Sequence, residues 1–335
     1  MEIGVKDPAK SIRSRALLGL FVLIGGVVCA AASQLGLLFA ALLAAPLASL
    51  FLVESECKPV FSIISSLCVI GVDLLFNGIY SFACVGGVVI SVIIFICYKT
   101  AFLAKAEGAL LATVVISAVM ALTVYMWGAY MAKSVEPASV LAYFDELLAD
   151  LRAVFTEYIA RSVAMDKTGE LALILTPEVA SDLFDSYLNE IYSTVAILAF
   201  TIVGLSYKLF GVVFKRYTDK PESLSAWRFS LTPLYGYFYL ALYVLQIFAG
   251  REGAFALAVS NLTTFFMLVL AYVGLRSIRE FTRRRGTGGG LSTAFFILML
   301  VVSPSITVSL LSFIGAYVTC KVKDNAQSGT DGTAN

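Results

Sequence analysis

The chain is a succession of apolar runs of about 20 residues, separated by short polar segments. An α-helix needs about 20 residues to cross the roughly 30 Å hydrocarbon core of a bilayer, so runs of this length predict membrane-spanning helices. Eight or nine spans are predicted, at 16–33, 36–53, 59–75, 78–98, 109–131, 191–213, 231–249, 254–275 and 290–318. The last run carries Pro304 near its middle and is either one kinked helix or a broken hairpin. The pattern predicts an all-α fold, a polytopic transmembrane helix bundle.

One long polar stretch, 133–190, interrupts the apolar runs and is predicted to be an extracytoplasmic helical insert. Its first part has apolar residues at steps of three and four, as on one face of an amphipathic helix. These residues are Val140, Leu141, Phe144, Leu147, Leu148, Leu151, Val154, Phe155 and Tyr158. A second helix is predicted to start at Thr176, with Pro177 at its first position and Glu178 favourable to the helix dipole. Such helices either lie on the outer membrane surface or cap the bundle.

These patterns divide the chain into five parts. They are a cytoplasmic N-terminus at 1–15, a first transmembrane group of five spans at 16–132, the insert at 133–190, a second transmembrane group of three to four spans at 191–318, and a disordered polar tail at 319–335. The basic residues before the first run could be taken for the start of a signal peptide. That interpretation is rejected because the run continues into more membrane-type sequence instead of a soluble domain.

The distribution of basic residues predicts the orientation. With the N-terminus in the cytoplasm, 17 of the 24 lysines and arginines fall on the cytoplasmic side and seven fall outside. This asymmetry follows the positive-inside rule, so we expect a multi-pass protein of the bacterial cell (inner) membrane. The side of the C-terminus stays open, because a hairpin at Pro304 would return Lys321 and Lys323 to the cytoplasm.

Composition narrows the chemistry. Hydrophobic residues make up 59% of the chain and charged residues 14%, which would leave a soluble protein with too little polar surface. The net charge is +1 and the basic residues sit at span ends, so no basic face for nucleic acid is expected. The chain has no histidine, which removes the commonest general base and transition-metal ligand. The six cysteines include no CxxC pair. We therefore expect no enzymatic activity, no catalytic residue, no bound metal and no cofactor.

One helix face carries the best candidate ligand-binding residues. Tyr235, Tyr239 and Tyr243 recur at every fourth residue of a predicted span that ends near Gln246, so their hydroxyl groups share one side of the helix. Asn261 lies close to the outer end of the next span, where its amide could approach Gln246 and Tyr243. Convergent polar groups between aromatic walls are typical of sites for small neutral ligands. The same pattern also arises from hydrogen bonds between helices and from aromatic residues at the membrane interface.

Two further polar features have simpler interpretations. Asp73 and Asn77 are expected at the outer turn between the third and fourth spans, as turn and cap residues. The run Arg283-Arg284-Arg285 precedes several glycines and predicts a basic, flexible loop that touches anionic lipid, or else a docking point for a partner.

Several segments of the second half resemble the YybS-like family of predicted bacterial membrane proteins, a domain of unknown function. The matching segments are SAWRFSLTP at 225–233, NLTTFF from Asn261, AYVGL at 271–275 and LLSFIGAY at 310–317. This family is distantly similar to the substrate-binding subunits of energy-coupling-factor transporters and to MreD-like cell-shape proteins. The resemblance covers about residues 10–325 and implies a helix bundle with short loops.

Two functional hypotheses follow. The first is an inner-membrane protein that binds a small-molecule solute and helps to transport it, through the face from Tyr235 to Gln246 and through Asn261. The alternative is a non-transporting envelope scaffold, for example in cell-wall assembly, cell shape or sporulation, whose external helices bind a membrane or envelope protein partner. A buried pocket that opens outward would favour solute binding, and an exposed apolar groove along 137–191 would favour a scaffold.

Overall fold

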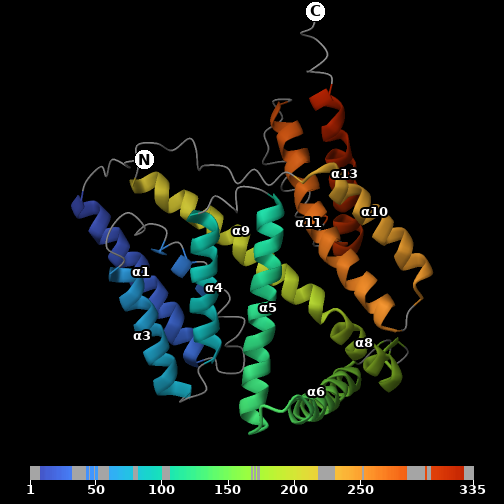
Figure 1. Cartoon of the computed structure of the whole chain (residues 1–335). Coiled ribbons are helices and arrows are strands. Elements are labelled where there is room, and N and C mark those ends of the chain that lie inside the picture. The colour runs from blue at the N-terminus through green and yellow to red at the C-terminus, as the bar shows by residue number, and fades with distance from the viewer. Residues whose placement is uncertain are drawn as a thin grey trace, which may run out of the picture. The chain divides into compact units, whose positions relative to one another are not determined.

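The computed structural model describes residues 8–31, 60–77, 82–99, 106–166, 174–217, 231–250, 253–284 and 303–327, with isolated residues between them, most of these in 43–51. Every regular element in these ranges is an α-helix (Figure 1). The helices are α1 (Pro8–Ala31), α3 (Val60–Asn77), α4 (Phe82–Lys99), α5 (Ala106–Met131), α6 (Pro137–Met165), α8 (Pro177–Asn189), α9 (Ile191–Tyr217), α10 (Pro233–Phe248), α11 (Ala254–Arg284) and α13 (Pro304–Gln327). The all-α prediction is confirmed for the described part of the chain.

Among the residues that the structure describes, a few helices have the length and apolar composition needed to cross a membrane. Glu107–Met131 in α5 and Ala254–Thr282 in α11 are long and apolar enough to span a bilayer. A third span results if Pro177–Asn189 and Ile191–Ser206, bent by 47°, form one broken span. Shorter apolar helices lie within α1, α3, α4 and α10. Association with a membrane through two or three spans is therefore supported, whereas the predicted eight or nine spans are not shown.

Proline marks the start of several helices. The first residue is a proline in five of the described helices, namely α1, α6, α8, α10 and α13. The first helical N–H has no partner inside the helix, and the fixed φ of proline is already helical, so proline suits this position. Pro304 is therefore the first residue of α13. Helix α13 continues to Gln327, past the boundary at 318 that was predicted for the span.

The predicted basic loop after the eighth run is partly helical. Helix α11 continues nine residues beyond the predicted end at 275 and ends at Arg284. Arg276, Arg279 and Arg284 thus lie on a helix, and the Arg284 guanidinium pairs with the Glu280 carboxylate one turn earlier at 2.8 Å. Arginine and glutamate are good helix formers, and this spacing stabilises a helix end, which explains the extension.

Some predictions fall outside the described residues. They concern most of the span at 36–53, the SAWRFS segment at 225–230, Arg285 with the following glycines, the first part of 290–318, and the tail after Gln327.

The described chain forms two compact units. The first comprises Met1–Phe102, Leu110–Ile191 and Leu198–Trp227, and the second Leu103–Ala109, Tyr192–Ile197 and Arg228–Asn335. In the first unit, α1 lies beside α3, and α4 packs against both (Figure 1). Their core includes Val22, Val69 and Cys84, all at most 1% exposed.

In the second unit, α11 and α13 lie side by side and α10 packs on both (Figure 1). Two glycines allow the backbones of α11 and α13 to touch. A Cβ atom added at Gly274 would lie 2.1 Å from the Leu311 carbonyl oxygen, and one at Gly315 would lie 2.0 Å from the Leu270 carbonyl oxygen. Small residues that permit such close approach are the usual means of helix association in membranes. The composition of α11 and α13 did not indicate that these glycines face each other.

Candidate functional site

The structure places the central tyrosine of the predicted ligand-binding face in the core of the second unit. Tyr239 on α10 is fully buried. Its hydroxyl lies 2.8 Å from Oγ of Ser312 on α13, and the Ser312 hydroxyl donates to the Ser309 carbonyl at 2.7 Å. The Ser312 proton is thus already engaged, so Tyr239 donates to Ser312. This hydrogen bond joins two helices, as the alternative interpretation of the face predicts.

Asn261 on α11 joins this helix to the first turns of α9, which belong to the same unit. Its Oδ1 accepts a hydrogen bond from the Ser193 backbone N–H at 2.8 Å, and its Nδ2 donates to the Leu257 carbonyl at 2.9 Å. Ser193 is the third residue of α9, where backbone N–H groups have no partner within their own helix. The buried Asn261 amide therefore caps α9 from a neighbouring helix.

The other three candidate residues lie nearer the surface of the unit. Tyr235 stacks on Phe266 of α11 with ring centroids 6.1 Å apart. Tyr243 meets the Phe313 ring edge to face at 5.2 Å and stays 42% exposed. The Gln246 side chain is exposed. The tyrosines thus meet aromatic side chains of α11 and α13, as aromatic packing between helices predicts.

Asp73 lies within helix α3 and not in a turn, whereas Asn77 is the last residue of this helix. Helix α3 extends to Asn77, so Asp73 occupies its last full turn and is 2% exposed. The prediction of a turn at Asp73 is therefore wrong, because the apolar residues around Asp73 continue the helical pattern.

A well-defined corner connects α5 to the insert. At the end of α5 the Ser134 N–H donates to the Ala129 carbonyl at 3.0 Å, across five residues, and Lys133 between them has φ 52°. This is the Schellman arrangement, whose left-handed position is normally glycine. The Tyr125 hydroxyl then donates to the Val135 carbonyl at 3.0 Å and fixes the chain beyond the turn. No local sequence signal predicted this corner, because lysine is uncommon at such a position.

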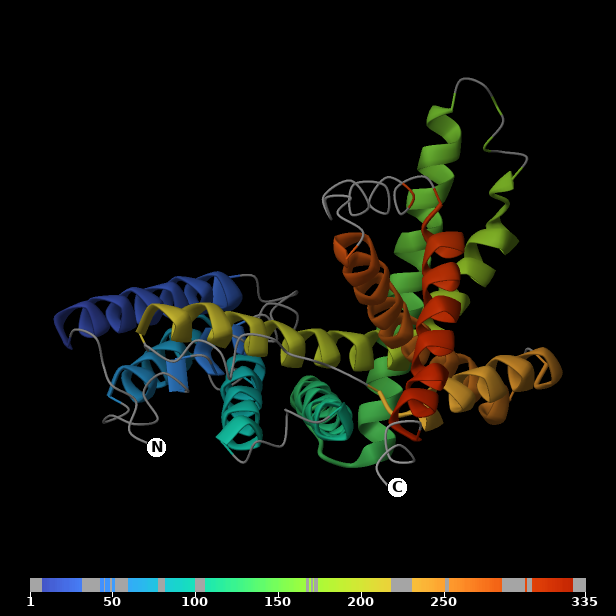
Figure 2. The same cartoon turned by 90° about the horizontal axis from the view of Figure 1, so that it is seen from above.

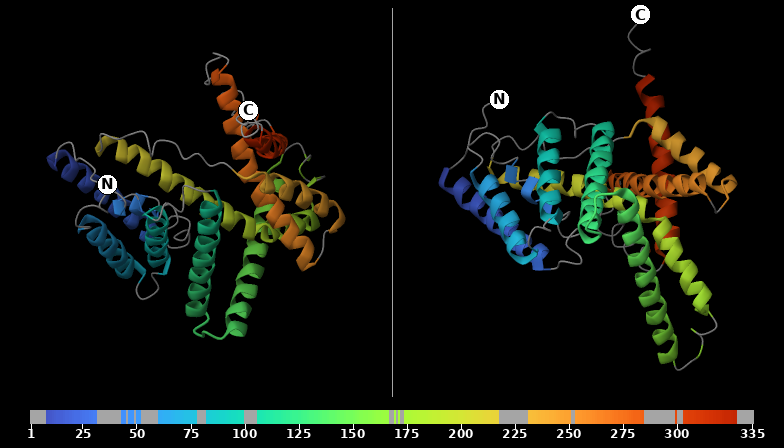
Figure 3. Two further views of the ribbon diagram at one scale, coloured as in Figure 1. Left: turned by 45° about the horizontal axis from the view of Figure 1, so that its top comes forward. Right: turned by 60° about the horizontal axis from the view of Figure 1, so that its bottom comes forward.

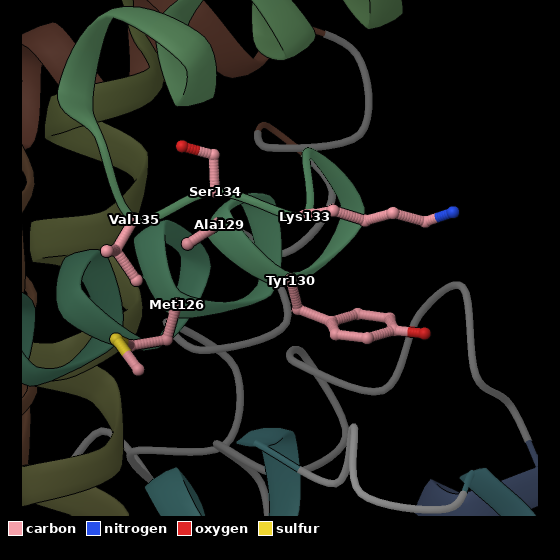
Figure 4. A pocket seen from close by; sticks show the side chains of 6 residues that line it. All are labelled: Met126, Ala129, Tyr130, Lys133, Ser134 and Val135. Atoms are coloured by element: carbon pink, nitrogen blue, oxygen red, sulfur yellow. The ribbon is translucent and has the colours of Figure 1, made fainter.

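An open, mainly apolar hollow lies at this corner (Figure 4). Its lining consists of Met126, Ala129, Tyr130, Lys133, Ser134 and Val135. The Tyr130 and Lys133 side chains extend in the same direction, away from Met126 and Val135 (Figure 4). All of the lining residues belong to the end of α5 and the following turn, so the hollow is part of the corner.

The corner allows a direct test of its backbone conformation. We expect Lys133→Gly to raise the free energy of unfolding by about 1 kcal/mol, because glycine adopts the left-handed region without the steric cost that lysine incurs. The measurement is thermal unfolding of the purified full-length protein in detergent. The control is Lys167→Gly, which makes the same substitution elsewhere in the insert. A lower thermal unfolding midpoint for Lys133→Gly than for the unsubstituted protein would contradict the left-handed conformation of Lys133.

The first turns of α6 pack on the end of α5. A Cβ atom added at Gly128 would lie 2.5 Å from Cζ of Phe144 and 3.2 Å from Cγ1 of Val140, so Gly128 provides the space for both side chains. Trp127 of α5 meets the rings of Tyr143 and Phe144 at 5.9 and 6.3 Å. Val140 is fully buried. Apolar and aromatic contacts thus attach the insert to α5.

Helices α6 and α8 lie side by side and form a hairpin (Figures 2 and 3). The Arg152 guanidinium forms an ion pair with the Asp185 carboxylate and lies 5.6 Å from the centre of the Phe184 ring. Phe155 meets the same ring at 5.8 Å. The amphipathic helix predicted over Val140 to Tyr158 is confirmed as α6, but its pairing with α8 was not predicted, because it depends on contacts across 33 residues.

The start of α8 agrees with the prediction. Thr176 is the N-cap, its Oγ1 accepts from the Val179 N–H at 3.4 Å, and Pro177 follows. The Glu178 pKa is lowered by its own backbone N–H and then by the Thr176 hydroxyl, which both donate to the carboxylate. A carboxyl with a lowered folded-state pKa stabilises the folded state above its unfolded pKa, and that contribution is lost as the pH falls through the folded pKa.

Comparison with known protein families, with curated proteins and with solved structures gave no match. The resemblance to the YybS-like family therefore stays a prediction from the sequence.

Proposed function

We propose that this protein is a multi-pass protein of the bacterial inner membrane, with its N-terminus in the cytoplasm, and that it acts as a non-transporting scaffold of the cell envelope. In this proposal the shorter apolar helices also cross the membrane, and the hairpin of α6 and α8 is the part that meets other envelope proteins. Cell-wall assembly, cell shape and sporulation are the processes in which such a scaffold would work.

The observation that carries the proposal is that the insert is a folded helical hairpin held by specific contacts. A linker between spans needs no internal structure, whereas this hairpin has an aromatic attachment to α5 and an ion pair between its two helices. In contrast, two of the residues predicted to bind a solute form hydrogen bonds between helices, Tyr239 to Ser312 and Asn261 to Ser193. Rigid elements that present a surface are typical of binding proteins.

The charge of the hairpin indicates the chemistry of a partner. Residues 133–190 contain eleven acidic and four basic side chains. Two of the basic ones are already paired inside the hairpin, Arg152 with Asp185 and Arg161 with Glu157. The surface left over is acidic and includes the exposed carboxylates of Asp145, Glu146 and Asp150. We therefore propose a partner with a basic surface.

One observation favours solute binding as a second candidate. Tyr243 and Gln246 on α10 keep exposed side chains one turn apart, so a hydroxyl and an amide are accessible on the predicted ligand-binding face. A small neutral solute would hydrogen-bond these two groups, with Phe313 as an aromatic wall.

The two candidates are separated by native mass spectrometry of the protein extracted gently from its own membrane, combined with chemical cross-linking. For a scaffold we expect an envelope protein to co-purify, with its cross-links on α6 or α8. We expect at least a tenfold loss of that protein, about 1.4 kcal/mol, in the Asp145→Asn/Glu146→Gln/Asp150→Asn variant.

The control is Ala142→Gln, which changes the exposed surface of α6 without changing its charge. It should retain the partner. A protein that arrives without partners but with a bound small molecule, which is lost from the Tyr243→Phe/Gln246→Ala variant, would replace the scaffold proposal with solute binding.

A further inference from the structure

The apolar residues of α6 form one continuous row, only the beginning of which is covered within the first unit. Val140 and Phe144 contact α5 around Gly128. The row continues in steps of three, four and seven residues, which keep it on one side of an α-helix. Its later members are Leu151, Val154, Tyr158 and Met165, exposed by 48, 63, 68 and 79%.

The direction of this row follows from the geometry of the corner. Helix α6 runs across the end of α5, since α5 is seen from the side and α6 end-on in Figure 1, and the reverse in Figure 2. The side of α6 that faces α5 is the side that carries Val140 and Phe144. The exposed remainder of the same row therefore faces the layer through which α5 passes.

Helix α8 adds a second exposed apolar row. Val179, Leu183 and Tyr187 recur at every fourth residue and are 37, 38 and 70% exposed. At 100° per residue, the centre of this row lies about 150° from the mean direction of Phe184 and Asp185, which face α6. The exposed α6 row lies about 100° from Arg152 and Phe155, which face α8, in the same rotational sense. In two antiparallel helices, rotations in the same sense turn both rows toward one face of the hairpin.

We propose that this face of the α6–α8 hairpin lies on the bilayer, with its apolar rows in the acyl boundary of the leaflet where α5 ends. The inference rests on the membrane placement of α5 in the proposed function. The occupant is lipid because the row is continuous with the α5 contact and points to the side that α5 occupies. An amphipathic helix on a membrane buries its apolar face by about 5–10 Å in this manner.

Charge and aromatic residues fit the same arrangement. Asp145 and Glu146 lie on the side of α6 away from the row, where they reach water. Trp127, Tyr130 and Tyr143 gather at the corner, at the level where aromatic side chains anchor helices in the headgroup layer. The acidic surface disfavours anionic headgroups, so zwitterionic lipid is the matching surface.

The test uses the full-length chain reconstituted into phosphatidylcholine vesicles, with Trp127 and Trp227 replaced by phenylalanine. Val154→Trp places a single tryptophan in the row, and Ala153→Trp places one on the neighbouring, polar side. We expect lipids brominated in the upper acyl chain to quench Val154→Trp at least about twofold more than Ala153→Trp, and aqueous iodide to show the reverse order. Tyr158→Trp repeats the measurement at a second position of the row.

A fourth variant separates this inference from the proposed function. Leu122 on α5 is 60% exposed, and Leu122→Trp reports whether α5 itself lies in lipid. If lipid quenches Leu122→Trp while iodide quenches Val154→Trp and Tyr158→Trp as strongly as Ala153→Trp, the hairpin stands clear of the bilayer and the inference is wrong. If lipid does not quench Leu122→Trp, the membrane placement of α5 fails and the inference fails with it.

Discussion

Replacing either glycine at the crossing of α11 and α13 with alanine is expected to destabilise the protein more than the same change at any other described glycine. The added Cβ atom would lie 2.1 Å from a carbonyl oxygen at Gly274 and 2.0 Å at Gly315. Both obstructing atoms belong to backbones, so no side-chain rotation relieves the overlap. The helices must move apart, which also affects the contacts of α10 with α13.

We expect Gly274→Ala and Gly315→Ala each to cost about 3 kcal/mol or more, at the upper end for overpacking. The measurement is the thermal unfolding midpoint of the full-length protein in detergent, where we expect a fall of at least about 5 °C. The matched control is Gly71→Ala in α3, where an added Cβ meets no atom within 4 Å. Equal midpoints for Gly274→Ala and Gly71→Ala would show that the backbones do not touch.

Removal of the Asn261 amide has the second-largest expected effect. Asn261→Ala leaves the buried Ser193 N–H without its acceptor at the start of α9. A buried donor that loses its partner costs about 1–3 kcal/mol, and water cannot replace the partner in an apolar bundle. We expect the thermal midpoint to fall and hydrogen exchange to accelerate at the first turn of α9.

The control for this prediction is Gln246→Ala, which removes an exposed amide from α10. Such surface changes usually alter stability by less than about 0.5 kcal/mol. If Asn261→Ala leaves the exchange at Ser193 unchanged, the capping role is wrong. If in addition a bound small molecule is lost from the variant, Asn261 belongs to a ligand-binding site, as the first hypothesis holds.

The two results also bear on function. Removing a residue that holds helices together lowers the free energy of unfolding. Removing a residue that contacts only a ligand weakens ligand binding and leaves the fold intact. Tyr239 and Asn261 form buried hydrogen bonds, as residues that hold helices together do. Tyr243 and Gln246 have exposed side chains, as residues that contact a ligand do. This contrast gives the solute-binding and scaffold proposals different mutational signatures.

Local patterns were sufficient for the helices themselves. The three- and four-residue steps from Val140 to Tyr158 predicted α6, and Thr176 with Pro177 predicted the start of α8, because both signals depend on neighbouring residues. The prediction was less successful at helix ends. Helix α11 runs past the predicted boundary at 275 to Arg284, since hydropathy marks the apolar segment and a helix continues wherever its backbone hydrogen bonds do.

The candidate site depended on longer-range contacts. The sequence placed Tyr235, Tyr239 and Tyr243 on one face, but the acceptor for the Tyr239 hydroxyl lies 73 residues away on α13. The Ser193 N–H that Asn261 caps is 68 residues away. No spacing rule connects such residues, so the sequence left open whether these polar groups faced a ligand or another helix.

The sequence by itself determined the helical class of this protein, its apolar composition and the amphipathic character of the insert, because these properties follow from residue type and local periodicity. The tertiary structure decided which polar groups join helices, where α11 and α13 touch, and which side of α6 stays uncovered. These features depend on residues far apart in the chain, and such contacts are fixed by the packing of whole helices.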